Sequence, residues 1–77
     1  MQAETSTPPT TRDIRLDLIS MHEWRVCDRR FSERDARCVL GFIERRGFDY
    51  EATSILPSGS LETYGSLATA TASFSVD

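Results

Sequence analysis

The stretch CVLGFIERRGFDYEATSIL, residues 38–56, constrains the fold of this chain more than any other segment. Two runs rich in β-forming residues flank ERRG, which has the composition of a tight turn. A type I turn over Glu44–Gly47 would place Gly47 where the backbone needs a positive φ, as in a three-residue hairpin with a G1 bulge. The sequence therefore predicts an antiparallel β-hairpin centred on this turn.

This turn also predicts a register for the hairpin. Three facing pairs follow from it: Glu44 with Phe48, Phe42 with Tyr50, and Leu40 with Ala52. One face of the hairpin would then be apolar and would carry Cys38, Leu40, Phe42, Phe48, Tyr50 and Ala52. The opposite face would carry Gly41, Ile43, Asp49, Glu51 and Thr53. The aromatic pair across the strands is a favourable one, which supports this register.

The residues before the hairpin predict further elements. In DIRLDLI, Ile14, Leu16 and Leu18 alternate with polar residues as in a strand, although a helix through Ile14, Leu18 and Met21 also fits. The alternation in WRVCDRR predicts a short strand over Trp24–Cys27 that ends near residue 29. After the hairpin, LETY is either a brief extra strand or the arm of a turn.

The C-terminal stretch GSLATATASFSVD permits two structures. Alternating small apolar and hydroxyl residues fit a strand, and the threonines at positions 69 and 71 are poor helix formers. As a helix, the segment would start after the N-cap residue Ser66 and would place Leu67, Ala70 and Phe74 on one face. The aromatic face of the hairpin needs a cover and no other segment can supply a helix, so we expect the helix.

These elements predict an α+β fold, in which a small antiparallel β-sheet of three or four strands carries a short C-terminal helix on one face. The polar, proline-containing residues 1–12 predict a disordered N-terminal tail, and residues 13–77 a single small domain. A chain this short buries roughly 60% of its unfolded surface, so its stability is marginal without a partner.

Charge is unevenly distributed along the chain. All nine basic residues are arginines, and seven of them lie in residues 25–46, whereas residues 47–77 hold four acids and no base. Six arginines are candidate contacts for nucleic acid or for a protein partner: Arg29, Arg30, Arg34, Arg37, Arg45 and Arg46. A net charge of −3 and the acids beside the hairpin turn weigh against nucleic acid.

The sequence contains no pattern typical of a catalytic, cofactor-binding or metal site. The soft metal ligands are His22, Cys27 and Cys38, and their spacing matches no structural zinc pattern. We expect the two cysteines to be buried thiols and His22 to be an exposed loop residue. Asp49 and Glu51 would lie about 7 Å apart on an exposed strand face, which is ordinary solvated surface.

The chain has neither an apolar run of ~18 residues nor a secretory signal, so the expected location is the cytoplasm, without membrane association. We expect a non-enzymatic interaction or accessory protein that binds no cofactor and no small-molecule substrate. Its expected ligand is a protein partner or a second copy of the chain, because opposed charges and free sheet edges favour association. The alternative is a small nucleic-acid-binding regulator that uses the arginine-rich hairpin turn and connection.

Three segments resemble a group of small, mostly uncharacterised actinobacterial proteins. They are WRVCD, DARCVLGFIERRGFDYEAT and YGSLATATASF. That group has a WRV-D strand, an LGFIE strand and a closing SL-x-x-A segment, which is a short amphipathic helix there. The resemblance covers roughly residues 24–74 and implies structure alone, since no function is assigned to the group.

Overall fold

The computed structural model of the chain describes residues 7–55 and 59–76. Five strands form one antiparallel sheet, in which they follow each other in chain order. The strands are β1 (Ile14–Ser20), β2 (Glu23–Asp28), β3 (Val39–Arg46), β4 (Asp49–Ser54) and β5 (Ser60–Tyr64). One-turn 3₁₀ helices precede β1 and β3, as η1 (Thr11–Asp13) and η2 (Ala36–Cys38), and the helix α1 (Leu67–Ala72) follows β5.

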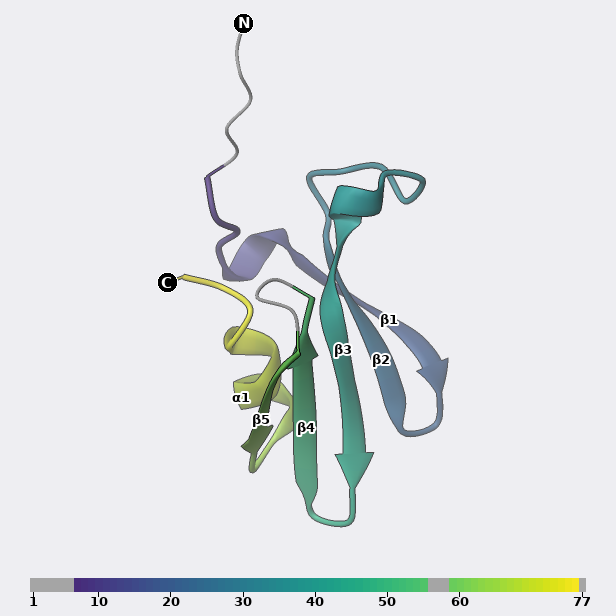
Figure 1. Cartoon of the computed structure of the whole chain (residues 1–77), viewed down its shortest axis with the longest axis vertical. Helices are drawn as coiled ribbons and strands as arrows, with labels where there is room; N and C mark the ends of the chain where they lie inside the picture. The colour runs from purple at the N-terminus through teal and green to yellow at the C-terminus, as the bar shows by residue number, and fades with distance from the viewer. Residues whose placement is uncertain (1–6, 56–58, 77) are drawn as a thin grey trace, which may run out of the picture.

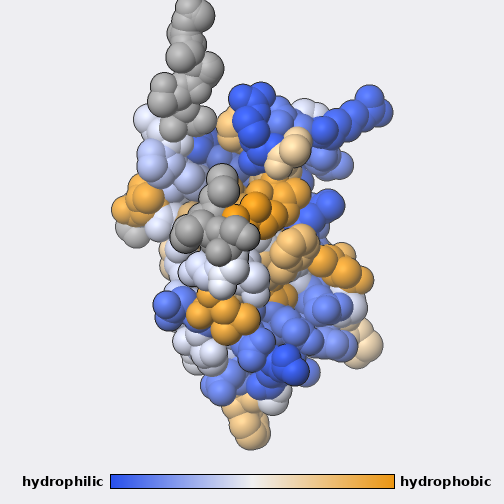
Figure 2. All heavy atoms as spheres, in the orientation of Figure 1, coloured by the Kyte–Doolittle hydropathy of each residue, from blue (hydrophilic) through white to orange (hydrophobic). Residues whose placement is uncertain are grey.

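The strands run lengthwise through the molecule (Figure 1), with the β1–β2 and β3–β4 turns at the lower end and the β2–β3 connection at the upper end. α1 packs on one face of the sheet, against β3, β4 and β5. The two ends of the described chain meet, since the backbone N–H of Val76 donates to the carbonyl oxygen of Pro9 at 3.1 Å. On the face shown in Figure 2, several separate apolar patches lie among hydrophilic side chains.

The predicted antiparallel sheet with a short C-terminal helix is confirmed, but the predicted number of strands is wrong. The sheet has five strands because Ile14–Ser20 pairs with β2 at one edge and Ser60–Tyr64 pairs with β4 at the other. The alternation in DIRLDLI therefore forms a strand and not a helix. Directly before β5, Gly59 has a φ of 80°, a conformation that glycine adopts without steric cost.

The C-terminal segment forms a helix despite its threonines. The Oγ of Ser66 accepts a hydrogen bond from the backbone N–H of Thr69 at 3.1 Å, so Ser66 is the N-cap as predicted. The hydroxyl of Thr71 donates to the carbonyl oxygen of Leu67 at 2.7 Å, inside the same helix. Ala70 is completely buried against the sheet, so tertiary packing outweighs the weak helix propensity of this segment.

The predicted three-residue turn of the central hairpin is wrong. β3 and β4 pair Arg46 with Asp49, which leaves Gly47 and Phe48 as a two-residue turn. Gly47 has a φ of 65° and Phe48 has no positive φ. Glycine with positive φ at the first central position is the pattern of a type II′ turn, whose twist matches that of the flanking strands.

The two-residue turn gives the hairpin a different register from the predicted one, so the predicted residue pairs and the predicted faces are wrong. Phe42 pairs with Thr53 and not with Tyr50. A shift by an odd number of residues exchanges the faces of one strand relative to the other. Gly41 and Ile43 therefore lie on the face covered by α1, whereas Phe42 lies on the opposite face and is 42% exposed.

The core lies between α1 and the sheet. Its buried apolar residues are Ile14, Val26, Ile43, Ala52 and Ala70, and the partly buried residues around them are Leu16, Trp24, Leu40, Tyr50, Tyr64, Leu67 and Phe74. Gly41 lies directly under the ring of Phe74. A Cβ at this position would lie 2.6 Å from Cε1 of Phe74 and would also meet the backbone oxygen of Thr53. The helix can approach the sheet here because β3 carries no side chain at this point.

We expect Gly41→Ala to destabilise the protein by about 1–3 kcal/mol, because the added methyl group would clash with the backbone oxygen of Thr53 and with the ring of Phe74. The free energy of unfolding, measured by urea denaturation, checks this. Gly65→Ala is the matched control, since a Cβ at Gly65 meets no atom within 4 Å. Equal stability of the two variants would show that the contact above Gly41 is loose.

Candidate functional site

The size of α1 leaves part of the sheet without a helical cover. A helix of six residues is about 9 Å long. Five strands spaced ~4.8 Å apart span about 19 Å across the sheet. α1 packs against β3, β4 and β5, and a cavity of about 620 Å³ lies between it and the β2–β3 connection. A second cavity, beside Phe42 and Glu44, is smaller, at about 140 Å³.

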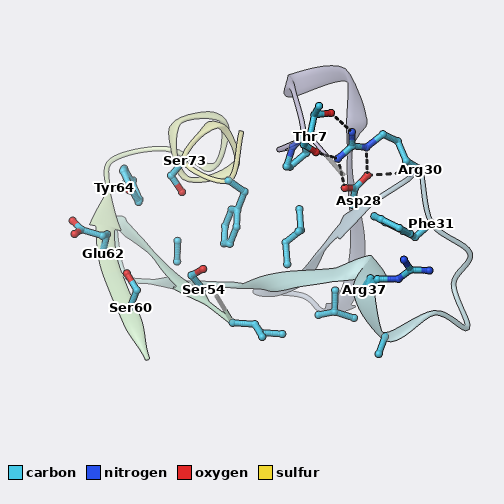
Figure 3. Close-up of a pocket in the computed structure, with 17 residues that line it drawn as sticks. Thr7, Asp28, Arg30, Phe31, Arg37, Ser54, Ser60, Glu62, Tyr64 and Ser73 are labelled. Atoms are coloured by element: carbon cyan, nitrogen blue, oxygen red, sulfur yellow. Dashed lines mark hydrogen bonds and ion pairs between the residues drawn. The ribbon is translucent and has the colours of Figure 1, made fainter. Parts of the chain in front are cut away.

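Figure 3 shows the cavity between two walls of different chemistry. The wall formed by β4, β5 and the end of α1 carries the carboxylate of Glu62 and four hydroxyl groups, from Ser54, Ser60, Tyr64 and Ser73. The opposite wall carries charged and aromatic side chains, from Asp28, Arg30, Phe31 and Arg37. Apolar side chains lie between the walls, from Val39, Leu40, Ala52, Ile55 and Phe74. The centre of the cavity is therefore apolar and its margins are polar.

The N-terminal segment forms part of the rim. The carbonyl oxygen of Thr7 accepts a hydrogen bond from Nη2 of Arg30 at 2.8 Å, and its hydroxyl oxygen accepts one from Nη1 at 3.2 Å. The backbone N–H of Thr10 donates to the carboxylate of Asp13 at 2.9 Å. The disordered tail predicted for residues 1–12 falls on residues 1–6, which lie outside the described residues, and on residues 7–12. The latter are held by these bonds, so the described chain starts before the predicted domain boundary at residue 13.

A buried ion pair closes one corner of the cavity. Asp28 is 2% exposed, and its carboxylate accepts hydrogen bonds from Nε and Nη2 of Arg30 at 2.9 and 2.8 Å. It also accepts one from the backbone N–H of Arg30 at 3.0 Å. The side-chain bonds from Arg30 lower the pKa of Asp28 below its ordinary value, and they outweigh the opposing effect of burial.

A second pair neutralises Arg37 at the same wall. Its Nη2 lies 2.6 Å from the carboxylate of Asp35, and the hydrogen bonds from Arg37 lower the pKa of Asp35 to about 2. The guanidinium also lies over the ring of Phe31, 4.7 Å from its centroid. Both arginines of the cavity are therefore held by partners within the protein.

The six candidate arginines lie at two ends of the sheet. Arg29, Arg30, Arg34 and Arg37 belong to the β2–β3 connection at the upper end of Figure 1, and Arg45 and Arg46 adjoin the β3–β4 turn at the lower end. Nη2 of Arg29 donates to the carbonyl oxygen of Ile14 at 3.0 Å. The arrangement offers no single phosphate-binding surface within the described residues, and nucleic-acid binding stays a prediction.

The structure brings the two cysteines together, which their spacing does not indicate. Cys27 and Cys38 are both buried and free. Burial, and then the neighbouring thiol of Cys38, raises the pKa of Cys27 to about 11, so its thiol stays protonated and weakly nucleophilic. His22 is exposed in the β1–β2 turn. No group of three histidine, cysteine or acidic side chains in residues 7–55 and 59–76 could hold a metal ion.

Sequence patterns predict little of the cavity lining. Arg30 and Arg37 are candidate contacts from their charge alone. The period-two alternation in SLETY could have indicated one wall, because it places Ser60 and Tyr64 on the same face of β5. The helical pattern of the C-terminal segment places Phe74 on the face that covers the sheet but does not indicate a cavity beside it. No local pattern indicates that Thr7 lines the cavity, since it does so through contacts with a distant part of the chain.

We expect Asp28→Asn to destabilise the protein by about 1–3 kcal/mol at pH 7, because it removes the charge that pairs with Arg30 in a buried position. Since the pKa of Asp28 is lower in the folded state, its stabilising contribution is complete above the unfolded pKa of about 4. That contribution disappears as the pH falls through the folded pKa. The difference between wild type and variant should therefore shrink toward pH 2, as measured by urea denaturation at each pH.

The control for this experiment is Asp49→Asn. Asp49 is exposed, and we expect a change within about 0.5 kcal/mol at pH 7. A difference between wild type and Asp28→Asn that stays constant down to pH 2 would contradict the role of the Asp28 charge.

The candidate site of this protein is thus a cavity with an apolar centre, which carries paired arginines on one wall and the carboxylate of Glu62 on the other. No helix in the described residues has the length and apolar character needed to cross a membrane. The resemblance to the actinobacterial group stays a prediction. The chain matches no protein-family model, no curated protein and no solved structure.

Proposed function

We propose that this protein is a non-enzymatic interaction module of the cytoplasm, which binds an apolar segment of a protein partner in the cavity beside α1. The cavity is the observation that carries the proposal. Its volume of about 620 Å³ lies within the range of ligand-binding cavities, ~300–1,000 Å³. When apolar side chains of a ligand replace the water in such a pocket, the free energy of the system falls, so binding is favoured.

The paired arginines at the margin favour an apolar ligand over an anionic one. Arg30 is 2.8 Å from the carboxylate of Asp28, and Arg37 is 2.6 Å from that of Asp35. An anionic ligand would have to compete with these internal pairs. Apolar side chains can fill the space between Leu40 and Phe74 without disturbing them. The hydroxyl groups of the opposite wall are suited to hydrogen bonds with the backbone of a bound segment.

The nucleophilic side chains of the described residues support a non-enzymatic role. A catalytic serine or cysteine needs a base within hydrogen-bond reach. The hydroxyl of Ser73 donates to the carbonyl oxygen of Ala70 at 2.6 Å, and the thiol of Cys27 is buried. The single histidine of the chain, His22, lies in the β1–β2 turn, at the end of the sheet opposite the β2–β3 connection.

We expect the capped peptide acetyl-Leu-Ala-Phe-Leu-amide to bind in the cavity, and acetyl-Ser-Ala-Ser-Ser-amide not to bind. Two-dimensional NMR titration with ¹⁵N-labelled protein measures this. The apolar peptide should shift the amide signals of Leu40, Ala52 and Phe74, because these residues line the centre of the cavity.

The variant Ser60→Trp should weaken binding of the apolar peptide by roughly tenfold or more, because the indole ring would occupy the cavity. Thr63→Trp is the matched control, since Thr63 lies on the same strand with its side chain on the opposite face of the sheet. The proposal fails if the apolar peptide shifts no cavity signal, or if the two tryptophan variants bind it equally.

A further inference from the structure

A carboxylate on the wall of the cavity distinguishes its two sides. Glu62 belongs to β5 and pairs with Ala52 of β4, so its side chain lies on the same face of the sheet as that buried core residue. It lines the cavity on the side away from Arg30 and Arg37 (Figure 3). The cavity therefore has a negative charge at one margin and its arginines at the other.

The charges of the lining do not balance within the described residues. Asp28 and Arg30 line the cavity and pair with each other, and Arg37 pairs with Asp35. The remaining charged side chain of the described lining is Glu62. It takes part in none of the ion pairs that residues 7–55 and 59–76 form. The two arginines are thus neutralised, whereas this carboxylate is not.

The sequence explains why the wall around Glu62 has no cation. β4, β5 and α1 all belong to residues 47–77, which hold four acids and no base. The arginines of the lining come from the β2–β3 connection on the opposite wall, where Asp28 and Asp35 hold them. A cation that pairs with Glu62 inside the cavity therefore has to come from a ligand.

The surroundings of Glu62 suit a long cationic side chain. Tyr64 lies two residues further along β5, on the same face and about 7 Å away. Lysine and arginine pack an apolar stem against such a surface and keep the charged head in water. Glu62 is exposed, so an ammonium or guanidinium group can meet it without losing most of its hydration.

We propose that the apolar segment bound in this cavity carries a lysine or arginine beside its apolar residues, and that Glu62 selects this charge. This inference rests on the function proposed above, because it names the chemistry of the same ligand. The apolar side chains lie between Leu40 and Phe74, and the cationic side chain extends along Tyr64 to the margin. An acidic segment is repelled by Glu62 and finds the arginines already paired.

A double-mutant cycle measures the contact between Glu62 and the cation. The protein is wild type or Glu62→Gln, and the peptide is acetyl-Leu-Ala-Phe-Lys-amide or the same peptide with norleucine instead of lysine. Norleucine keeps the apolar stem and removes the charge. NMR titration at about 0.05 M salt gives the four Kd values. Glu62→Gln should weaken binding of the lysine peptide by roughly three- to fivefold and leave the norleucine peptide unchanged.

A second pair of peptides carries lysine or norleucine at the first position, before Leu-Ala-Phe. The pair that responds to Glu62→Gln shows in which direction the segment lies in the cavity. Raising the salt concentration to about 0.5 M should remove the response, because salt screens a contact at an exposed margin.

The matched control is Glu51→Gln. Glu51 lies on β4, next to β5, and pairs with Thr63, so its side chain lies on the opposite face of the sheet. This variant should bind the lysine peptide like the wild type. Circular dichroism checks that both glutamine variants are folded.

The proposal is overturned if Glu62→Gln leaves the binding of both lysine peptides unchanged, or if Glu51→Gln weakens it as much. When the norleucine peptide binds in the cavity and the cycle shows no coupling, the charge selection alone is refuted. When no peptide binds, the proposed function is refuted together with it.

Discussion

The contact between Gly41 and the ring of Phe74 is the constraint on which the rest of the structure depends. A Cβ on Gly41 would lie 2.6 Å from Cε1 of this ring, so α1 can settle on the sheet only where β3 has no side chain. This approach buries Ala70 against Ile43 and Ala52. It also decides which face of the five-stranded sheet becomes the core and which face stays exposed.

Because α1 is short, it covers only part of one face of the sheet and, within the described residues, leaves the other face without a helix above Phe42 and Leu61. On the covered face, α1 contacts three of the strands and leaves the cavity beside the β2–β3 connection. Internal pairs hold the two arginines that line it, as Asp28 holds Arg30. On the opposite face, Phe42 and Leu61 stay partly exposed.

The central hairpin shows why a local pattern can predict an element and miss its faces. Gly47 needs a positive φ in both the predicted three-residue turn and the observed type II′ turn. The local sequence is compatible with both turns. The apolar pattern favours the three-residue turn, because that turn pairs Phe42 with Tyr50. The observed register exposes Phe42 and places Gly41 under Phe74. The contact that accompanies this register thus joins Gly41 to a residue 33 positions away in the chain.

The sequence by itself determined the elements: the alternation of Ile14, Leu16 and Leu18, the positive φ of Gly47, and the Ser66 cap that starts α1. These features depend on backbone preferences within a few residues. They sufficed for an antiparallel sheet, whereas the C-terminal helix was expected only because a sheet of this size needs a cover on one face. Tertiary structure alone decided the hairpin register, the cavity, and the contact between Cys27 and Cys38. The physical reason is that burial depends on contacts between segments distant in the chain. The sequence of one strand therefore does not determine which of its faces is covered.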